Sequence, residues 1–564
     1  MKKYLITPAI LLAALSASAE TLSPAAALAR ATEELPVTAS AARRVAAAAA
    51  TVAAEPLMTI AKDSRNPELY VFAAGDGLVV ASAESEAPAL LGYSDFYAPE
   101  ADMPPAMQWL LNAYAAEIQA LRRGDVIETA ATSSRADFEP IEPLCSTKWN
   151  QGTPYNDLCP KIGSKLTYTG CVATAMAQVL KVMEYPEKCS GGMYNYYWEN
   201  GQQALSKNFD NITLDWKNMA NTYTASSGST KRRAVANLMA AVGYASDMNY
   251  GTDASGAHGL YACAGLIRNF DYDYTLQYLR RDWFSWADWE AIIYGEIAKG
   301  IPVYYDGVNT KEKVGHAFVV DGYNADGFFH LNWGWGGSLD GYFLLTALDP
   351  NGQQGIGGSS GGYSDQAGAL IGLEKGRTMT DATAPLTFAS SGDLTINKSS
   401  TIVFGSAFTV SFSPTGGIYN YSPFTVPSVE YALKLTSGDD VYYTALSPSG
   451  STKPYYGVSG FSTSVARGIP TGSYTVTLAV HNPTTDAYYD VYGEQTYVWR
   501  KTAVVTNASV KFTDYQEPSN AIAEIEAGDA PVEYFDLGGR SVVNPASGLY
   551  IRRQGSNTQT IYIR

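Results

Sequence analysis

The sequence predicts a multidomain protein with mixed α and β structure up to about residue 375 and all-β structure after residue 384. Three observations lead to this prediction. At 564 residues the chain is too long for one hydrophobic core. Residues 145–375 alternate between helical and strand periodicity. From residue 384 onward, short runs rich in Thr, Val and Tyr are separated by clusters of Gly, Pro and Ser.

The N-terminus has the pattern of a secretory signal peptide. Lys2 and Lys3 precede a mostly apolar stretch, and Ala17-Ser18-Ala19 offers the small residues at which signal peptidase cuts. A buried N-terminal helix is the alternative interpretation. No later segment approaches the roughly 18–20 apolar residues that a membrane-spanning helix needs. We therefore expect a signal peptide at residues 1–19 and a protein that is secreted or held at the cell surface.

Charge and cysteine content exclude several classes of partner. A formal net charge of −16 argues against binding to nucleic acid, whose phosphates require basic patches, and against docking on an anionic membrane. Five cysteines leave one unpaired if the others form up to two bridges, which export would permit. The cysteines include no C-x-x-C pair, and the chain has four histidines, so we predict no metal site.

Residues 20–135 are predicted to form a small unit of their own. Residues 25–54 are alanine-rich, and Leu69–Val80 reads as two strands around a Gly-Asp-Gly turn. Met107–Leu121 has apolar residues at helical spacing. The unit ends in an irregular linker around Ser133-Ser134-Arg135.

The middle of the chain combines helices with a hairpin. Val172–Met183, Ala234–Val242 and Trp289–Ile297 have helical patterns. Ile301–Tyr305 reads as a strand, and Ala317–Trp333 as two strands joined by a polar Asn-Ala-Asp-Gly turn.

The C-terminal third predicts β structure. Runs such as Thr401–Phe412, Val429–Leu435 and Ser473–Val480 alternate apolar and polar residues. This alternation is typical of an immunoglobulin-like sandwich, which we place at residues 384–515. Residues 520–564 are expected to form a further small strand unit.

One cysteine lies where a thiolate would be stabilised. Gly170-Cys171-Val172 places Cys171 at the first turn of an amphipathic helix. The helix dipole and free N–H groups there favour a thiolate, so we expect a pKa lowered toward roughly 3.5–7.5. A buried structural thiol is the alternative, and for a lone cysteine it would be the more common one.

A nucleophilic cysteine needs a base beside it, and His316 stands at the mouth of the apolar strand Ala317–Val320. At the end of the neighbouring strand, Asn332-Trp333-Gly334-Trp335-Gly336-Gly337 places two tryptophans that could wall off and orient an imidazole. As core packing this run would be unusual, because glycines weaken a strand. A core histidine is the alternative for His316 alone. Taken together, these signals predict a thiol nucleophile with a histidine base.

These stretches resemble the papain-like cysteine proteases of the streptopain family, peptidase family C10. The resemblance runs in family order from Trp149 to Phe343 and reaches the family's pro-region at Leu91-Gly92-Tyr93-Ser94. It does not cover residues 384–564. The fold class it implies is multidomain: an N-terminal α+β pro-domain at 20–135, an α+β papain-like catalytic domain at 136–376, and the C-terminal all-β immunoglobulin-like module.

The resemblance also implies roles for individual residues. Cys171 would be the acylated nucleophile, and His316 would take its proton and later protonate the leaving amine. Gln151 would donate its side-chain amide to the oxyanion together with the Cys171 N–H. Trp335 would shield the site. Papain orients its histidine with an asparagine, whereas streptopain has a tryptophan in that place, so we favour Trp333 over the adjacent Asn332.

Function and partners follow from the same resemblance. It implies a cysteine endopeptidase made as a zymogen, acting on proteins and peptides without a metal or organic cofactor. Its own pro-domain would inhibit it, with the irregular run Asp95–Pro105 lying across the cleft. The rival interpretation is a catalytically idle surface adhesin on a protease-like scaffold.

The chain end carries a second resemblance. Val532–Arg552 is similar to the C-terminal sorting domain of type IX secretion, found in Bacteroidota. This implies an outer-membrane secretion machinery as partner and a sorting domain at residues 520–564. An ordinary β-hairpin is the alternative.

Overall fold

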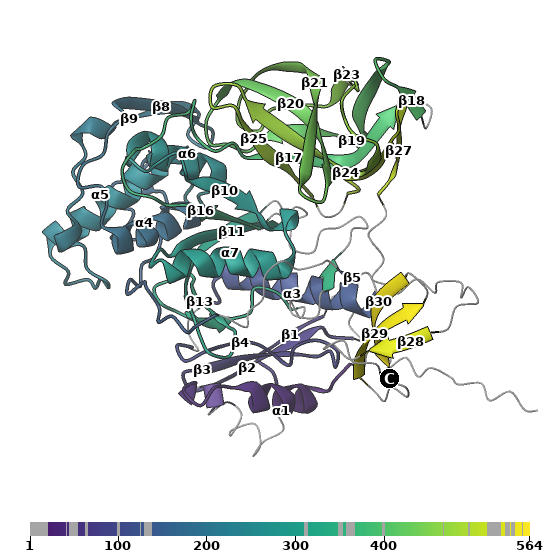
Figure 1. The fold of residues 1–564 in the computed structure, drawn as a ribbon. Coiled ribbons are helices and arrows are strands. Elements are labelled where there is room, and N and C mark those ends of the chain that lie inside the picture. The colour runs from purple at the N-terminus through teal and green to yellow at the C-terminus, as the bar shows by residue number, and fades with distance from the viewer. Residues whose placement is uncertain are drawn as a thin grey trace, which may run out of the picture.

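The protein is represented by a computed structural model. It describes residues 21–40, 42–43, 45, 55–61, 66–98, 102–123, 126–128, 138–309, 314–347, 354–356, 367–397, 401–465, 467–494, 497–515, 532–535, 542, 548–554 and 557–563. The predicted signal peptide and the linker around Ser133-Ser134-Arg135 lie outside these residues. Figure 1 shows an α/β body that begins with the N-terminal helix, an all-β module, and a separate small sheet at the C-terminus.

The described part of the N-terminal region includes the helices α1 (Pro24–Glu34) and α3 (Pro105–Arg123) and the strands β1 (Met58–Ile60), β2 (Leu69–Ala74), β3 (Gly77–Ser82) and β4 (Leu90–Ser94). Ser23 caps α1, since its hydroxyl oxygen accepts the Ala26 N–H at 3.3 Å, and Pro24 occupies the first turn. The predicted strand–turn–strand and the helix after residue 105 are confirmed.

The next region contributes four helices that follow the predicted patterns in part: α4 (Cys171–Met183), α5 (Ser229–Ala245), α6 (Gly259–Asn269) and α7 (Trp286–Ala298). Three short 3-10 helices accompany them: η2 (Phe209–Asn211), η3 (Trp216–Asn218) and η4 (Arg281–Trp283). Helix α4 ends at Glu184, which has a left-handed backbone (φ 46°) two residues before Pro186. The predicted helices at α4, α5 and α7 are confirmed, whereas α6 was not predicted.

Six strands of this region extend the N-terminal sheet: β10 (Gln277–Arg280), β11 (Val303–Asn309), β12 (Val314–Tyr323), β13 (Phe329–Asn332), β14 (Gly341–Phe343) and β16 (Gly368–Ile371). The ten strands follow the order β1-β2-β3-β4-β14-β13-β12-β11-β16-β10. The junction is antiparallel, with Tyr342 of β14 opposite Tyr93 of β4. The N-terminal region is therefore part of the same sheet as the predicted hairpin.

Three smaller pairings lie off this sheet: β5 (Val126–Glu128) with β15 (Gln354–Ile356), β6 (Lys161–Ile162) with β7 (Lys165–Leu166), and β8 (Met193–Trp198) with β9 (Gln203–Asn208).

Two hydrophobic cores lie on opposite faces of the sheet, because side chains alternate along a strand. On β12, Phe318 and Val320 join the core that includes residues of α3 and α7. Ala317 and Val319 join the core that includes residues of α4, α5 and α6. Strand β12 thus separates α4, which begins at Cys171, from α3 of the N-terminal region.

The C-terminal region is built from strands alone among its described residues: β17 (Phe388–Asn397), β18 (Thr401–Val403), β19 (Ala407–Asn420), β20 (Val426–Ser437), β21 (Asp440–Thr452), β22 (Gly457–Val458), β23 (Gly460–Ser464), β24 (Gly472–Asn482), β25 (Ala487–Gly493), β26 (Lys501–Val505) and β27 (Ser509–Asp514). Its pairings run β17-β19-β23-β21-β20-β24-β25 and return to β17. The all-β prediction is confirmed, and the immunoglobulin-like assignment stays a prediction. The predicted strand Thr401–Phe412 is broken at Gly405 (φ +82°).

The all-β module packs tightly on the α/β body. Trp283 stacks on Tyr492 at a ring-centroid distance of 5.1 Å and meets the edge of Tyr421 at 4.9 Å. Arg280 of β10 donates to the Tyr421 hydroxyl at 3.3 Å and lies 3.9 Å from Glu494. In Figure 1 the module lies against the end of the body that carries α6 and β10. The sequence indicates a change in residue pattern at residue 384, but it does not predict this interface.

The last described strands, β28 (Val532–Phe535), β29 (Gly548–Gln554) and β30 (Asn557–Ile563), form a separate antiparallel sheet. None of the described helices is long and apolar enough to cross a membrane. All five cysteines are free, so the bridges that the cysteine count permits do not form.

Candidate active site

Gly170 sets the position of Cys171 at the start of α4. Its φ of +86° favours glycine, and a Cβ there would lie 2.8 Å from the Met248 sulfur and 2.9 Å from the Ser255 carbonyl oxygen. The chain therefore passes close to the 248–255 loop before it enters the helix. The Cys171 side chain is partly exposed, and its Sγ lies 4.0 Å from the carbonyl oxygen of Gly315.

The thiol is held protonated in this structure. Burial raises the pKa of Cys171 above its ordinary value, while the N–H groups of Ala317 and Val172 act in the opposite direction. The expectation of a lowered pKa is therefore wrong for the full-length chain. The helix N-terminus favours the thiolate, but desolvation outweighs it.

His316 lies on β12 directly after Gly315, so its backbone borders the sulfur. The side chain is half-buried, and burial lowers its pKa to about 4. Among the described residues, His316 has no hydrogen-bond partner, and none joins its imidazole to the Cys171 sulfur. Both groups are thus neutral near pH 7.

The indole of Trp109, from α3, covers the face of the sheet beside His316. Gly307 of β11 is the strand partner of His316, and directly opposed residues carry their side chains on one face. A Cβ at Gly307 would lie 2.0 Å from the Trp109 indole, so the ring fills the space that a side chain at Gly307 would need. Trp109 also packs 6.2 Å from the Phe318 ring.

The backbone of Gln151 is hydrogen-bonded to the segment that precedes Cys171. The Thr169 N–H donates to the Gln151 carbonyl oxygen at 3.2 Å, two residues before Cys171. The Gln151 side chain is partly exposed and makes no hydrogen bond within the described part of the chain. Its amide therefore remains able to donate to a substrate oxygen.

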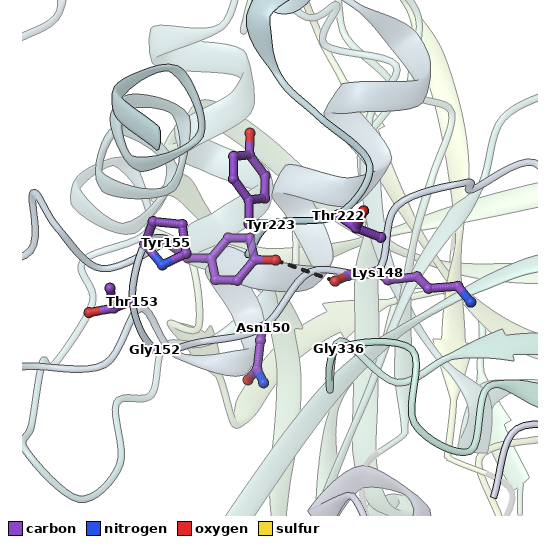
Figure 2. Close-up of a pocket in the computed structure, with 9 residues that line it drawn as sticks. Lys148, Asn150, Gly152, Thr153, Tyr155, Thr222, Tyr223 and Gly336 are labelled. Carbon is purple, nitrogen blue, oxygen red and sulfur yellow. Dashed lines mark hydrogen bonds between the residues drawn. The ribbon is translucent and has the colours of Figure 1, made fainter. Parts of the chain in front are cut away.

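A pocket of about 240 Å³ is lined by both chain neighbours of Gln151, Asn150 and Gly152 (Figure 2). Its walls come from the 148–155 segment, from residues 222–223 and from the glycine after Trp335: they are Lys148, Asn150, Gly152, Thr153, Pro154, Tyr155, Thr222, Tyr223 and Gly336. The Tyr155 hydroxyl donates to the Lys148 carbonyl oxygen at 3.3 Å across this pocket. Trp335 is partly buried next to it.

The acceptor atom of the Asn332 side chain is occupied by hydrogen bonds. Its Oδ1 accepts from Gln178 Nε2 at 2.9 Å and from the Gly334 N–H at 3.0 Å, and its Nδ2 donates one N–H to the Thr147 carbonyl oxygen at 2.8 Å. The side chain is buried. An asparagine that orients a histidine would accept from the imidazole through Oδ1, and both lone pairs of this oxygen are already used, so these contacts indicate a structural role.

Trp333 lies on the same face of the sheet as His316. Its ring packs against Phe318 at 5.1 Å and Phe343 at 5.2 Å, and its Nε1 donates to the Leu339 carbonyl oxygen at 2.7 Å. Phe318 is two residues from His316, so Trp333 supports the strand segment that carries the histidine. A direct hydrogen bond between them is not found among the described residues.

Asp306 was not identified from the sequence. It lies opposite Ala317, is buried, and accepts the hydroxyl groups of Tyr278 and Tyr304, both at 2.8 Å. Burial raises its pKa to about 7, and its charge would raise the pKa of Cys171. The only sequence signal was a carboxylate that interrupts an apolar strand.

The other three histidines lie outside this group of residues. Buried His330 is paired with Asp321 at 2.6 Å, and His481 lies between Glu430 and Asp486. Carboxylates thus hold both of these imidazoles. His258 is exposed and directly precedes α6.

Comparison with known proteins identifies the family. The model of the peptidase C10 family matches residues 149–343, and that of the Spi protease inhibitor matches residues 19–118. Streptopain from Streptococcus pyogenes is 33% identical over 331 residues, which cover 55% of this chain and 81% of streptopain. The chain belongs to the peptidase C10 family.

Further relatives of this C10 peptidase cover the same part of the chain. The thiol protease/hemagglutinin PrtT of Porphyromonas gingivalis is 33% identical over 323 residues, or 54% of this chain and 37% of PrtT. A solved fragment of Prevotella intermedia prointerpain A is 32% identical and covers 57% of this chain and 99% of the fragment, with a TM-score of 0.47.

The family confirms the resemblance found in the sequence. The chain is a cysteine-type endopeptidase with an inhibitor-like N-terminal region, which fits protein substrates and intramolecular inhibition. Residues 384–564 lie beyond both matched segments.

Proposed function

We propose that this C10 peptidase hydrolyses peptide bonds with Cys171 as nucleophile and His316 as base. One observation supports this above the others: the sulfur at the start of α4 faces the Gly315–Ala317 segment of β12, which carries His316 at its centre. The backbone of Gln151 is hydrogen-bonded to Thr169, two residues before Cys171. Two segments that are distant in sequence, α4 and β12, thus meet at one thiol, and the Gln151 segment pairs with the residues just before it.

The reaction would proceed by acyl transfer. The Sγ of Cys171 attacks the scissile carbonyl carbon while its proton passes to the His316 imidazole. The Gln151 amide and the Cys171 N–H donate to the oxyanion, and loss of one such donor typically costs about 100–1000-fold in rate. His316 then protonates the departing amine, and water hydrolyses the thioester to restore the thiol.

Residues 20–135 would keep the enzyme inactive until they are removed. The Trp109 indole covers the sheet beside His316, and burial holds the imidazole neutral. Once this helix leaves, water would reach the ring, and its pKa would rise toward its ordinary value of about 6.5. A thiolate–imidazolium pair could then form.

The described part of Asp95–Pro105 contacts the catalytic region away from the nucleophile. The Phe96 carbonyl oxygen accepts the Leu339 N–H at 3.1 Å, and Lys148 Nζ lies 4.7 Å from the centre of the Phe96 ring. Residues 99–101 lie outside the described part. We propose that this segment covers the rim of the pocket beside Gln151, whereas α3 acts behind His316.

We further propose export and sorting of this peptidase. Residues 1–19 would act as the signal peptide, with domains at 20–135, 136–376, 384–515 and 520–564. The separate three-stranded sheet at the chain end is compatible with a sorting domain. Deleting residues 520–564 in the native host and following the protein by fractionation tests this. Unchanged delivery to the surface or medium would rule it out.

The idle-adhesin alternative is disfavoured because Cys171, His316 and Gln151 are all present. The printed name of PrtT couples thiol protease with hemagglutinin, but that name describes PrtT. Casein hydrolysis by the matured protein, with and without the thiol-directed inhibitor E-64, tests the proposal. We expect hydrolysis that E-64 abolishes, whereas an inert protein would support the adhesin.

A further inference from the structure

A loop of the all-β module reaches the catalytic region through Tyr455. This residue lies between β21 and β22 with a left-handed backbone (φ 63°), which is unusual for a bulky side chain. Buried Asn420 holds the loop there: its carbonyl oxygen accepts the Tyr455 N–H at 2.8 Å, and its Nδ2 donates to the Thr452 carbonyl oxygen at 3.0 Å. The ring is therefore fixed by its own module.

The Tyr455 ring completes an aromatic cluster with the start of α6. Its centroid lies 6.1 Å from that of His258 and 6.0 Å from that of Tyr261, both edge-to-face. Tyr261 is 40% exposed, His258 is exposed, and Tyr455 is partly exposed. The cluster is thus open to solvent, unlike the Trp283–Tyr492 contact that anchors the module.

Two contacts link the segment that carries His258 to the residues around Cys171. Gly170 packs against Ser255, three residues before His258. A Cβ at Gly259 would lie 2.6 Å from Asp306 Oδ2, and the Asp306 charge acts on both Cys171 and the Tyr455 phenol. The cluster shares no residue with the pocket beside Gln151.

We infer that Tyr455, His258 and Tyr261 form a wall of the substrate cleft and recognise an apolar or aromatic side chain of the bound peptide. This rests on the proposed function. Ring edges and faces offer edge-to-face packing to an incoming side chain. Because residues 384–564 lie outside the matched family segments, whereas His258 and Tyr261 lie within one, the Tyr455 ring is what the module adds to this wall.

The alternative is that Tyr455 only fastens the module. A fastening role would alter stability and activity on all peptides alike. A recognition role would alter the preference among peptides, through KM, because the contact is made in the bound state before chemistry. These two roles give different kinetic patterns.

The test uses matured enzyme that keeps the all-β module, with fluorogenic peptides that carry Phe, Leu or Gly at successive positions on each side of the scissile bond. For Tyr455→Ala we expect KM to rise about tenfold for Phe or Leu at one position, with the corresponding Gly peptide and kcat little changed. Tyr455→Phe should behave like the parent. Tyr443→Ala, on the module surface against Tyr488, is the matched control and should change nothing.

Tyr261→Ala provides a second variant should Tyr455→Ala fail to fold, and the same position should be affected. An unchanged Phe-to-Gly ratio of kcat/KM at every position in both variants would overturn the inference, as would an equal loss on all peptides. If the parent enzyme cleaves no peptide in an E-64-sensitive manner, the proposed function itself fails. These two failures are distinguishable.

Discussion

Trp109 of helix α3 lies directly over Gly307, the strand partner of His316. An added Cβ at Gly307 would be 2.0 Å from the indole, so no other residue at position 307 would allow this contact without a shift. The inhibitor-like region therefore acts on the histidine's side of the sheet, while Cys171 lies at the helix on the other core.

Replacing this indole should loosen the inactive state. We expect Trp109→Ala in the full-length protein to speed alkylation of Cys171 by iodoacetamide at least severalfold, because His316 becomes accessible to water and can pair with the thiol. Gln108→Ala, an exposed neighbour on α3, should label at the parental rate. Equal labelling of all three proteins would mean that Trp109 does not restrain the site.

Substitutions at Asn332 and Trp333, the two candidates for orienting His316, should differ in their effects on stability and on kcat/KM. Asn332→Ala should lower the melting temperature, since three hydrogen bonds of a buried amide are lost at about 1–3 kcal/mol for each buried partner left unsatisfied. Folded Asn332→Ala should nevertheless keep more of its kcat/KM than folded Trp333→Ala. The reverse ranking of kcat/KM, measured at a temperature where both are folded, would favour the asparagine.

Glu117 should make the zymogen sensitive to pH. This α3 residue is buried, accepts the Ala347 N–H at 2.6 Å and the Thr346 hydroxyl at 3.1 Å, and burial raises its pKa from 4.5 to about 7. The folded state therefore keeps a proton that the unfolded state releases above pH 4.5. The free energy of unfolding therefore decreases as pH rises from 4.5 toward 7. Above pH 7 the folded protein bears the full free-energy cost of burying the Glu117 carboxylate.

Glu117→Gln removes this cost while keeping an acceptor oxygen. In a Cys171→Ala background, which prevents self-cleavage, it should melt within error of its parent at pH 4.5 and several degrees higher at pH 8. The measurement is thermal unfolding at both pH values. A constant difference between the two proteins would show that Glu117 does not titrate in this range.

Local patterns predicted much of the body and the elements that carry the two proposed reacting residues. The period of Val172–Met183 and the turn before Phe328 fixed α4 and the β12–β13 hairpin, and with them Cys171 and His316. Helix α6 was missed although its apolar residues recur at helical spacing; it has no side-chain N-cap, and Gly259 and Gly265 fall within it. The raised pKa of Cys171 was missed because burial depends on tertiary contacts.

Long-range relationships left no local signal. The pairing of β4 with β14 joins segments that are far apart in sequence, and no motif marks it. Tyr455 lies in the all-β module, and only the packed structure places it beside His258. The cysteine count likewise could not show that the thiols stay unbridged: the four other than Cys171 are all buried in one hydrophobic core, and all are free.

The most direct test of the central claim is the site of E-64 attachment in matured enzyme, determined by peptide mapping alongside casein hydrolysis. We expect one adduct, on Cys171, in proportion to the activity lost, and we expect Cys171→Ala to be folded, unlabelled and inactive. An adduct on Cys145, Cys159, Cys189 or Cys263 that tracks the loss, or casein hydrolysis by Cys171→Ala at the parental rate, would contradict the assignment of Cys171 as nucleophile.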